Sequence, residues 1–261
     1  MIDTLLLKKD SNGIVVITFN RPDVLNALDL ATMKRFAEVV AEIAQDADLR
    51  AVILTGAGDS AFCSGGDLVE LSQYPSAEDG RAFITTMGDA LLMLERFPVP
   101  VIAAINGYAL GGGSEIALAC DLRIVDERAK MGFVQIKNAL IPGWGGGQRL
   151  LRLVGYSRAM ELLSNGKPMS AAEAHTLGLV NRVVEAGKAF ESALEMAQQI
   201  ATQPPEVVKA IKTLLQAGLH ESYQDALKIE RDLFPPLWAD EPHLKAVEQF
   251  LNRRKGKIAQ K

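Results

Sequence analysis

Histidine and cysteine are scarce in this chain of 261 residues, which contains three histidines and two cysteines. His175, His220 and His243 lie far apart in polar segments, so a histidine-based metal site and a histidine-activated nucleophile are both disfavoured. Cys63 and Cys120 make no disulfide framework, and so few cysteines are typical of a reducing compartment. Backbone amides and the side chains of carboxylic acids and amides are therefore the groups expected to carry chemistry.

The chain also lacks an excess of positive charge and any long apolar run. Its 28 Lys and Arg residues against 32 Asp and Glu give a net charge of −4, which provides no footprint for nucleic acid. No apolar run approaches the length of a membrane span, and the start, MIDTLLLKKD, lacks the features of a signal peptide. We therefore expect a cytoplasmic protein without nucleic-acid or membrane partners, whose 48% hydrophobic residues allow a sizeable core.

Up to about residue 185, short apolar runs alternate with helical periodicity, which predicts an α/β fold with a helix-covered sheet. The Asn12-Gly13 turn predicts a hairpin of residues 5–8 and 14–19, and Asp29 is a plausible N-cap for a helix over 30–44. Further strands are expected at 51–55, 101–105, 122–125 and 179–184, and a further helix at 82–96 after a looser polar segment at 72–80.

After about residue 186 the strand signals end. Helices are expected at 193–201, 206–217, 223–233 and 244–254, separated by Pro204-Pro205, Gly218 and Pro235-Pro236. The sequence therefore predicts two parts, a core over residues 1–185 and a helical region over 186–261. The helical region is expected to cap the core or to pack against another subunit.

Three consecutive glycines follow the strand expected at 101–105. The bend at Gly111–Gly113 leads into a helical pattern from Ser114 onward. The first N–H groups of a helix have no internal partner and lie at the positive end of its dipole, so this bend favours negative charge. Glu115 follows Gly112 by three positions, about one helical turn, so its carboxylate can face the same spot as the Gly112 amide.

The bend at Gly65–Gly66 follows the strand expected at 51–55 in a similar way. Two such bends can direct two N–H groups at one carbonyl oxygen, an oxyanion hole in which losing one donor costs roughly 3–4 kcal/mol of activation barrier. The residues after Gly111–Gly113 fit neither a P-loop nor a dinucleotide-binding loop, and Ser64 lacks the Gly-x-Ser-x-Gly frame of a nucleophile elbow. Cys63 is interpreted as a small residue that fills a tight bend rather than as a nucleophile. Together with Glu115, the two bends predict a catalytic site.

Longer stretches around these bends resemble the crotonase superfamily, the enoyl-CoA hydratase/isomerase group. In chain order they are NRPDVLNAL (20–28), AFCSGGDL (61–68), ALGGGSEIALACDLRI (109–124), IPGWGGGQRL (141–150), SAAEAHTLGLVNRVV (170–184) and FLNRRKG (250–256). The resemblance covers almost the whole chain and is more specific for the family than for the reaction. It implies a spiral of strand-strand-helix turns, whose helical C-terminal region assembles homotrimers or dimers of trimers.

The resemblance also implies an acyl-CoA substrate and assigns residues to it. The thioester oxygen would lie between the N–H groups of Gly66 and Gly112. The segment from Gly66 to Val69 would line the adenine end of CoA, and the loop around Val24 would contact its pantetheine and nucleotide. The full set of substrate-binding residues expected is Val24, Leu25, Ser64, Gly66, Asp67, Leu68, Val69, Gly112 and Trp144. No metal and no cofactor are expected, because CoA is part of the substrate.

The chain departs from the family pattern at its second acidic residue. Hydratases of this family pair two glutamates, of which the first matches Glu115 and the second lies seven residues before the proline of the IPG motif. That proline is Pro142, so the second position is Gln135. A glutamine side chain can orient a water molecule but does not exchange a proton near neutral pH.

Several reactions remain open at this point. Hydration of a 2,3-enoyl-CoA by Glu115 alone is the first expectation, with a rate lowered roughly 10²- to 10⁴-fold by the missing acid/base group. Decarboxylation of a methylmalonyl- or ethylmalonyl-type thioester is the alternative, because Gln135 removes one negative charge and Trp144 could form an apolar wall. Isomerisation by a single base is a third reading. A non-catalytic acyl-CoA-binding or RNA-associated protein is a fourth, against which the acidic balance and Glu115 argue.

Overall fold

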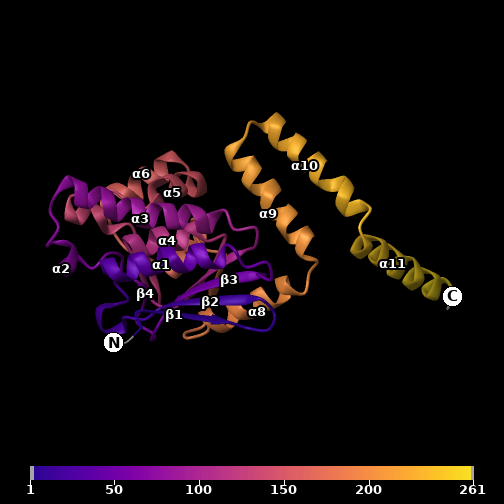
Figure 1. The fold of residues 1–261 in the computed structure, drawn as a ribbon, viewed down its shortest axis with the longest axis horizontal. Helices are drawn as coiled ribbons and strands as arrows, with labels where there is room; N and C mark the ends of the chain where they lie inside the picture. Colours follow the sequence, from indigo (N-terminus) through magenta and orange to yellow (C-terminus); the bar gives the residue numbers. More distant parts are fainter. Residues whose placement is uncertain (1–2, 260–261) are drawn as a thin grey trace. The chain divides into compact units, whose positions relative to one another are not determined.

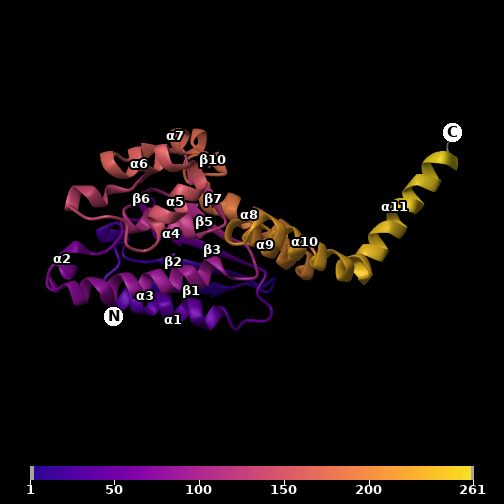
Figure 2. The same cartoon turned by 90° about the horizontal axis from the view of Figure 1, so that it is seen from above.

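The protein is described here by a computed structural model that covers residues 3–259, with side chains as far as Arg253. Its contacts divide the chain after Ala201 into two compact units. Their elements are drawn in Figures 1 and 2.

The first unit contains all the strands of the described residues. They are β1 (Leu5–Lys9), β2 (Ile14–Phe19), β3 (Ala51–Gly56), β4 (Ala61–Cys63), β5 (Val101–Ile105), β6 (Tyr108–Leu110), β7 (Leu122–Asp126), β8 (Lys130–Gly132), β9 (Met169–Ser170) and β10 (Arg182–Val184). Its helices are η1 (Pro22–Val24), α1 (Leu30–Ile43), α2 (Leu68–Leu71), α3 (Ala77–Glu95), α4 (Gly112–Ala119), η2 (Val134–Asn138), α5 (Gly146–Val154), α6 (Tyr156–Asn165), α7 (Ala171–Thr176) and α8 (Ala189–Ala201).

Two sheets organise this unit. The larger has the order β1-β2-β3-β5-β7-β10, and apart from the β1–β2 hairpin its pairs are parallel. The smaller has the order β4-β6-β8-β9. The chain repeats one course three times: a strand in the larger sheet, a short strand in the smaller sheet, then a helical segment. The predicted α/β fold with a spiral of strand-strand-helix turns is thereby confirmed.

The core of the first unit lies on both faces of the larger sheet. The larger cluster contains Phe19, Phe36, Leu54 and Leu91 and joins the sheet to α1, α3 and α4. The smaller cluster joins the other face to α8, where Ala193 lies against the strands. Figure 1 shows α1 and α3 on one side of β1, β2 and β3, with α8 on the other side. Strands covered on both faces have few positions for polar side chains, which explains their continuous apolar runs.

Local expectations are largely confirmed in this unit. The hairpin forms with Leu5 opposite Phe19, and the Asp29 side chain accepts a hydrogen bond of 2.8 Å from the Thr32 N–H as the N-cap of α1. The expected loose segment at 72–80 is wrong in part, because α3 begins at Ala77. There Ser76 and Asp79 form a capping box, a pattern that the sequence carried and that starts the helix early.

The division of contacts also differs from the expected parts 1–185 and 186–261. Helix α8 packs on β3, β5 and β7 and so belongs with the sheet, which places the division after Ala201 rather than after residue 185. The end of the strand signals did not show this, because a helix that follows the last strand can still pack on the sheet. Ala193 and Ala197 of α8 are buried against the strands, and partly buried side chains such as Leu194 pack beside them.

The second unit is helical, as expected. Its helices are α9 (Pro205–His220), α10 (Tyr223–Trp238) and α11 (Glu241–Ala259). The expected break at Pro235-Pro236 is wrong, since α10 continues to Trp238; both prolines lie in its last turn, where the helix ends soon afterwards. Many large apolar side chains of these helices are exposed, among them Leu215, Tyr223, Phe234, Trp238 and Phe250. No helix among the described residues is long and apolar enough to cross a membrane.

Candidate active site

The Gly111–Gly113 bend connects β6 to α4 by a close approach of backbones. Gly111 has φ +53°, and a Cβ on Gly113 would lie 1.8 Å from the carbonyl oxygen of Cys63, so a side chain has no room there. The Ser114 hydroxyl donates to the Ala109 carbonyl at 2.6 Å and accepts from the Gly132 N–H at 3.1 Å. These contacts hold the N-terminus of α4 against the smaller sheet.

The Gly65–Gly66 bend lies directly beside this helix terminus. Gly65 has φ +100°, and a Cβ on it would lie 2.9 Å from the Gly112 nitrogen. A parallel bridge joins Leu28 to Gly66, in which the Leu28 N–H donates to the Gly65 carbonyl at 2.8 Å. Among the turns, loops and caps of the described residues, neither the Gly66 N–H nor the Gly112 N–H donates to a backbone carbonyl. The structure thus brings the two predicted bends together and leaves both amides available to a ligand.

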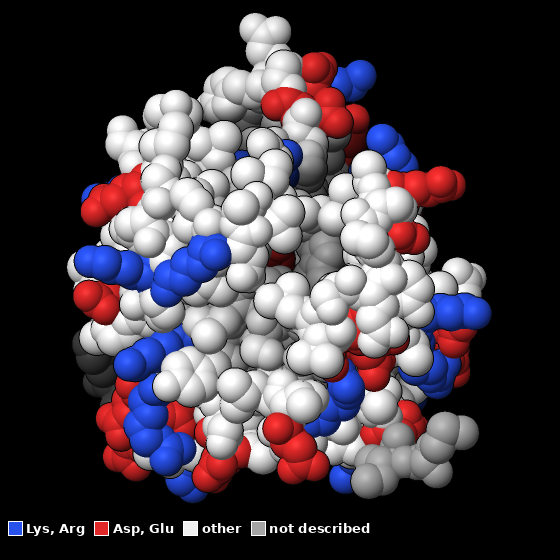
Figure 3. Space-filling model, turned by 90° about the vertical axis from the view of Figure 1, so that its left-hand side faces the viewer, with Lys and Arg blue, Asp and Glu red and all other residues white. Residues whose placement is uncertain are grey.

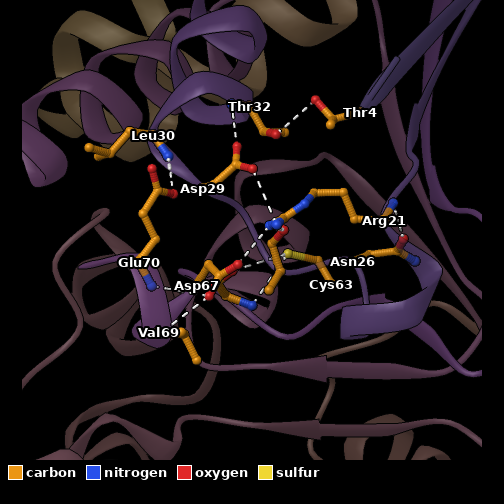
Figure 4. A network of polar contacts seen from close by, with 12 residues as sticks. Thr4, Arg21, Asn26, Asp29, Leu30, Thr32, Cys63, Asp67, Val69 and Glu70 are labelled. Carbon is orange, nitrogen blue, oxygen red and sulfur yellow. Dashed lines mark hydrogen bonds and ion pairs between the residues drawn. The ribbon is translucent and has the colours of Figure 1, made fainter. Parts of the chain in front are cut away.

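A polar network around Arg21 holds the segment that contains the Gly65–Gly66 bend (Figure 4). Arg21 forms ion pairs of 2.9 Å with Asp67 and 3.2 Å with Asp29 and donates to the Ala27 carbonyl at 2.7 Å. Buried Asn26, at φ +55°, accepts from the Arg21 N–H. The Asp67 side chain is therefore a structural group, since it also caps α2 by accepting from the Val69 N–H at 3.2 Å.

Several apolar side chains in the segments that carry this network are exposed. They are Val24, Leu25, Leu68 and Val69, all among the substrate-binding residues expected from the sequence. Figure 3 views the molecule from the side that carries α2 in Figure 1: uncharged surface surrounds a hollow, and charged side chains gather toward the edges. A surface of this kind suits a ligand that is largely apolar, with polar groups at one end.

Glu115 lies one turn inside α4, and its side chain is nearly enclosed, with 2% of the residue exposed. One carboxylate oxygen, Oε2, accepts hydrogen bonds from the backbone N–H groups of Trp144 at 2.7 Å and Gly146 at 2.8 Å. The other, Oε1, accepts from the Gly143 N–H at 3.3 Å and from the Gln135 side chain at 2.9 Å. A loop from the IPG motif thus surrounds the carboxylate with donors.

Burial raises the pKa of the Glu115 carboxyl above its ordinary value, and the four hydrogen bonds oppose that rise without cancelling it. A carboxyl with a raised pKa can both accept and return a proton nearer to neutral pH than an exposed one. The geometry and the electrostatics therefore agree on an acid/base group.

Gln135 reaches Glu115 from η2, as the family resemblance implied. Its Nε2 donates to the Glu115 carboxylate, while its own Oε1 is buried and has no hydrogen-bond partner. A buried acceptor without a donor is costly, and an oxygen left so beside an acid/base group is suited to a water molecule or a substrate group.

Trp144 contacts both halves of the site. A Cβ on Gly112 would lie 2.1 Å from Cζ3 of the indole, so the buried ring lies directly on the first residue of α4. Its backbone N–H is one of the Glu115 donors. The expectation that Trp144 forms an apolar wall agrees with this buried position, which the structure places beside Gly112.

The structure also bears on the nucleophiles and the metal site that the sequence disfavoured. Cys63 is fully enclosed, and burial raises the pKa of its thiol to about 12, so it is no thiolate nucleophile near neutral pH. Ser64 lies in the Gly65–Gly66 bend, where its N–H donates to the Leu25 carbonyl at 3.1 Å. The described residues contain no group of three or more His, Cys, Asp or Glu arranged to hold a metal ion.

Sequence reasoning missed the loop donors to Glu115. Gly143, Trp144 and Gly146 contribute through their backbone N–H groups, which are common to nearly every residue type and leave no mark in the sequence. The tight packing at Gly146 does leave a mark in the sequence, because only glycine fits there: a Cβ on Gly146 would lie 2.4 Å from the Glu115 Cγ.

A spiral α/β fold with two facing glycine bends and an enclosed acid/base carboxylate defines a class of enzymes that stabilise an oxyanion. Residues 9–261 match the enoyl-CoA hydratase/isomerase family, and the chain belongs to that family. It is similar to the short-chain-enoyl-CoA hydratase of Clostridium acetobutylicum, with 38% identity over 97% of each chain. It is 35% identical to a mitochondrial enoyl-CoA hydratase domain-containing protein of Mus musculus, over 100% of this chain and 89% of that protein.

Solved structures agree with the fold. The crystal structure of an enoyl-CoA hydratase from Bacillus anthracis superposes with a TM-score of 0.90 at 37% identity, covering 96% of this chain and 97% of that one. A structure of enoyl-CoA hydratase from Mycobacterium smegmatis also has a TM-score of 0.90, at 32% identity, and covers 96% of this chain and 97% of that one.

Proposed function

We propose that this chain is an enoyl-CoA hydratase that adds water across the 2,3 double bond of an acyl-CoA with a single carboxylate. The observation that carries this proposal is the enclosed Glu115 carboxylate, whose helix begins at one of the two available amides. Relatives named as enoyl-CoA hydratases, among them the Clostridium acetobutylicum protein and the Bacillus anthracis structure, support the same reaction.

In this mechanism, the thioester oxygen accepts hydrogen bonds from the N–H groups of Gly66 and Gly112. A water molecule lies between Glu115 and the unpartnered Oε1 of Gln135. Glu115 takes one proton as the water oxygen bonds to Cβ, and the π electrons move to give an enolate that the two amides stabilise. Glu115 then returns the proton to Cα. Gln135 orients the water and exchanges no proton.

The rest of the substrate follows from the exposed apolar side chains. Val24, Leu25, Leu68 and Val69 would contact the pantetheine and nucleotide of CoA, and Ser64 and the Asp67 backbone would line the same path. The Asp67 side chain is engaged with Arg21, so its proposed contact is through the main chain. The reaction needs no cofactor, because CoA is carried by the substrate.

A homotrimer or homohexamer is proposed for the assembly. The support is the second unit, in which, among the residues whose side chains are described, only Ala210, Lys212 and Ala217 are buried while many large apolar side chains are exposed. Exposed apolar area on this scale favours association with another subunit. Light scattering at micromolar concentration should give three or six times the mass of 28.2 kDa, and a monomer would contradict this assembly.

A cytoplasmic location is likewise proposed, with the lack of a disulfide between Cys63 and Cys120 as its support.

The experiment that tests the function compares substrates on the purified protein. Crotonyl-CoA should be hydrated, whereas methylmalonyl-CoA and ethylmalonyl-CoA should release no CO₂, since the enclosed Glu115 would repel a substrate carboxylate. Glu115→Gln should lower kcat/KM for hydration roughly 10²- to 10⁴-fold. Full hydration by that variant, or rapid CO₂ release without hydration, would contradict the proposal.

Gln135→Glu sharpens the test. A second carboxylate beside Glu115 restores an acid/base group, so hydration should become faster, by up to roughly 10²-fold. Gln135→Ala is the matched control, because it removes the water-orienting oxygen without adding a proton donor, and it should slow hydration. Slower hydration in Gln135→Glu than in Gln135→Ala would contradict the role given to this residue.

A further inference from the structure

The carboxylate of Glu115 is surrounded by a loop that is itself held by an ion pair. Arg149 of α5 donates through Nε and Nη2 to one oxygen of Glu95, at 2.9 and 2.8 Å. Glu95 is the last residue of α3. The two side chains are largely enclosed, with exposed fractions of 10% for Arg149 and 19% for Glu95. An ion pair shielded from water in this way keeps its geometry better than one on an open surface.

The same guanidinium reaches the loop. Its Nη1 donates to the Trp144 carbonyl at 2.8 Å, and a Cβ on Gly145 would lie 2.7 Å from that nitrogen. Gly145 has φ +90°, so the chain turns sharply around the arginine. Arg149 therefore fixes one end of the Trp144 residue to α3 and α5.

Trp144 transmits this restraint to the site in two ways. Its N–H donates to Glu115 Oε2 at 2.7 Å, and its indole lies on the α-carbon of Gly112. A shift of the Trp144 carbonyl would move both the donor to the base and the wall beside the proposed oxyanion donor. Neither Arg149 nor Glu95 hydrogen-bonds to Glu115 itself, so any influence they have on it passes through this loop.

We propose that the Arg149–Glu95 ion pair is a positioning device for catalysis: it anchors the Trp144 backbone and thereby holds the Glu115 carboxylate in its reactive orientation. The inference rests on the proposed role of Glu115 in hydration. It adds two residues that touch no reacting atom and act through the loop.

The neighbouring charge offers a matched control. Arg152, one turn further along α5, approaches the other oxygen of Glu95 at 3.9 Å and has an exposed side-chain fraction of 42%. It has the same charge and the same partner. Arg149 differs from it in binding the Trp144 carbonyl as well. The donors to the Glu115 carboxylate are all uncharged. The charged groups on α5 are thus Arg149 and Arg152, and those at the adjoining end of α3 are Glu95 and its exposed C-cap neighbour Arg96.

The experiment compares Arg149→Lys with Arg152→Lys, using crotonyl-CoA over a range of pH. Lysine retains the charge but has no fork that can bind Glu95 and the Trp144 carbonyl together. Arg149→Lys should lower kcat roughly tenfold to 10²-fold with little change in KM, as small misplacements of catalytic groups do. Its acidic limb of kcat/KM should move to higher pH, because a loosened loop donates less to the Glu115 carboxylate. Arg152→Lys should match the unmodified protein in both measurements.

Glu95→Ala separates anchoring from simple charge. Removing an anion would by charge alone lower the pKa of Glu115 and move the acidic limb to lower pH. Losing the anchor would move it to higher pH, as in Arg149→Lys. A shift to lower pH in Glu95→Ala, or equal behaviour of Arg149→Lys and Arg152→Lys, would overturn the inference. Arg149→Lys retains its charge and decides the question even if Glu95→Ala does not fold.

This failure is distinguishable from failure of the proposed function. If Glu115→Gln abolishes hydration while the two arginine variants behave alike, only the positioning role is lost. If Glu115→Gln hydrates at full rate, the base itself is wrongly assigned.

Discussion

The two glycine bends of the site begin alike and end differently. Each follows an apolar strand, contains a glycine with positive φ and leads into a helix. The Gly65–Gly66 bend leads into α2, whose Leu68 and Val69 are exposed. The Gly111–Gly113 bend leads into α4, which is entirely buried from Gly113 to Ala119. One bend therefore has its helix at the surface and the other has it in the core.

This difference separates binding from chemistry. The exposed residues that follow the Gly65–Gly66 bend can meet a long ligand from solvent, and a Cβ on Gly66 would meet only the ends of the Leu71 and Met33 side chains. The buried bend has a carboxylate one turn along its helix and is surrounded by backbone and by the Trp144 ring. Changes in the second bend should therefore affect stability and rate more than equivalent changes in the first.

The largest effect is expected from Gly113→Ala. The added Cβ would lie 1.8 Å from the Cys63 carbonyl oxygen, and neither backbone can move cheaply, so we expect a loss of about 3 kcal/mol or more in the free energy of unfolding. Urea titration measures it. Gly147→Ala is the control, since its nearest neighbour would be 3.9 Å away and alanine favours the helix. Equal stability of the two variants would contradict the close backbone approach at Gly113.

A smaller effect on rate should distinguish Gly112→Ala from Gly66→Ala. The Cβ of the former would strike the Trp144 indole at 2.1 Å, whereas that of the latter meets only the end of the Leu71 side chain at 2.7 Å. Disturbing an oxyanion donor costs roughly 10²- to 10³-fold in kcat, so we expect such a loss for Gly112→Ala and less than about tenfold for Gly66→Ala. Steady-state hydration of crotonyl-CoA gives both values. The reverse order would mean that the surroundings of Gly66 are more rigid than those of Gly112.

A third effect concerns pH. The pKa of Glu115 is raised in the folded protein, so the native state retains a proton that the unfolded chain has released. Stability from this group is therefore present below the unfolded pKa and is lost as pH rises through the folded pKa, at no more than about 1.4 kcal/mol per pH unit. Against Glu115→Gln, the unmodified protein should lose stability as pH rises above about 4.5. Unfolding midpoints of both proteins across pH measure this, and a relative gain instead would show that the carboxylate is better stabilised by its four donors than by water.

The smallest effect is expected at Cys63. Burial raises the pKa of its thiol to about 12, so thiol reagents at pH 8 should leave the folded protein unlabelled at this residue. Mass spectrometry before and after addition of denaturant checks it, and rapid labelling without denaturant would show that the Gly65–Gly66 bend opens in solution.

The sequence predicted best the elements that leave a clear local pattern. Most strands of the larger sheet and the cap at Asp29 were predicted, since runs of five or six residues and a capping side chain leave clear patterns, whereas the strand expected at 179–184 is shortened to Arg182–Val184. The smaller sheet was not, because strands such as β6 and β9 have only three and two residues and no periodicity can show in them. Helices α5 and α6 were also missed.

The site follows the same rule. The two bends and Glu115 were predicted from local patterns, and the family resemblance implied the donors Gly66 and Gly112 and the position of Gln135. The structure brings these bends and side chains together. Their supports at Gly143 and Gly146 act through main-chain N–H groups, and Arg149 acts through a backbone carbonyl. Such partners depend on how distant segments meet, which local sequence does not encode.

The unpartnered oxygen of Gln135 has one more consequence. A primary amide carries a donor and an acceptor of nearly equal size on the same carbon, so half a rotation exchanges them. While Glu115 is ionised, the NH₂ end faces it; once Glu115 holds a proton, the oxygen can face it instead. The Gln135 amide would then rotate in each turnover and form a hydrogen bond to Glu115 in both of its protonation states, without changing its own charge. A second glutamate can only accept hydrogen bonds when it is charged and so cannot adapt in this way.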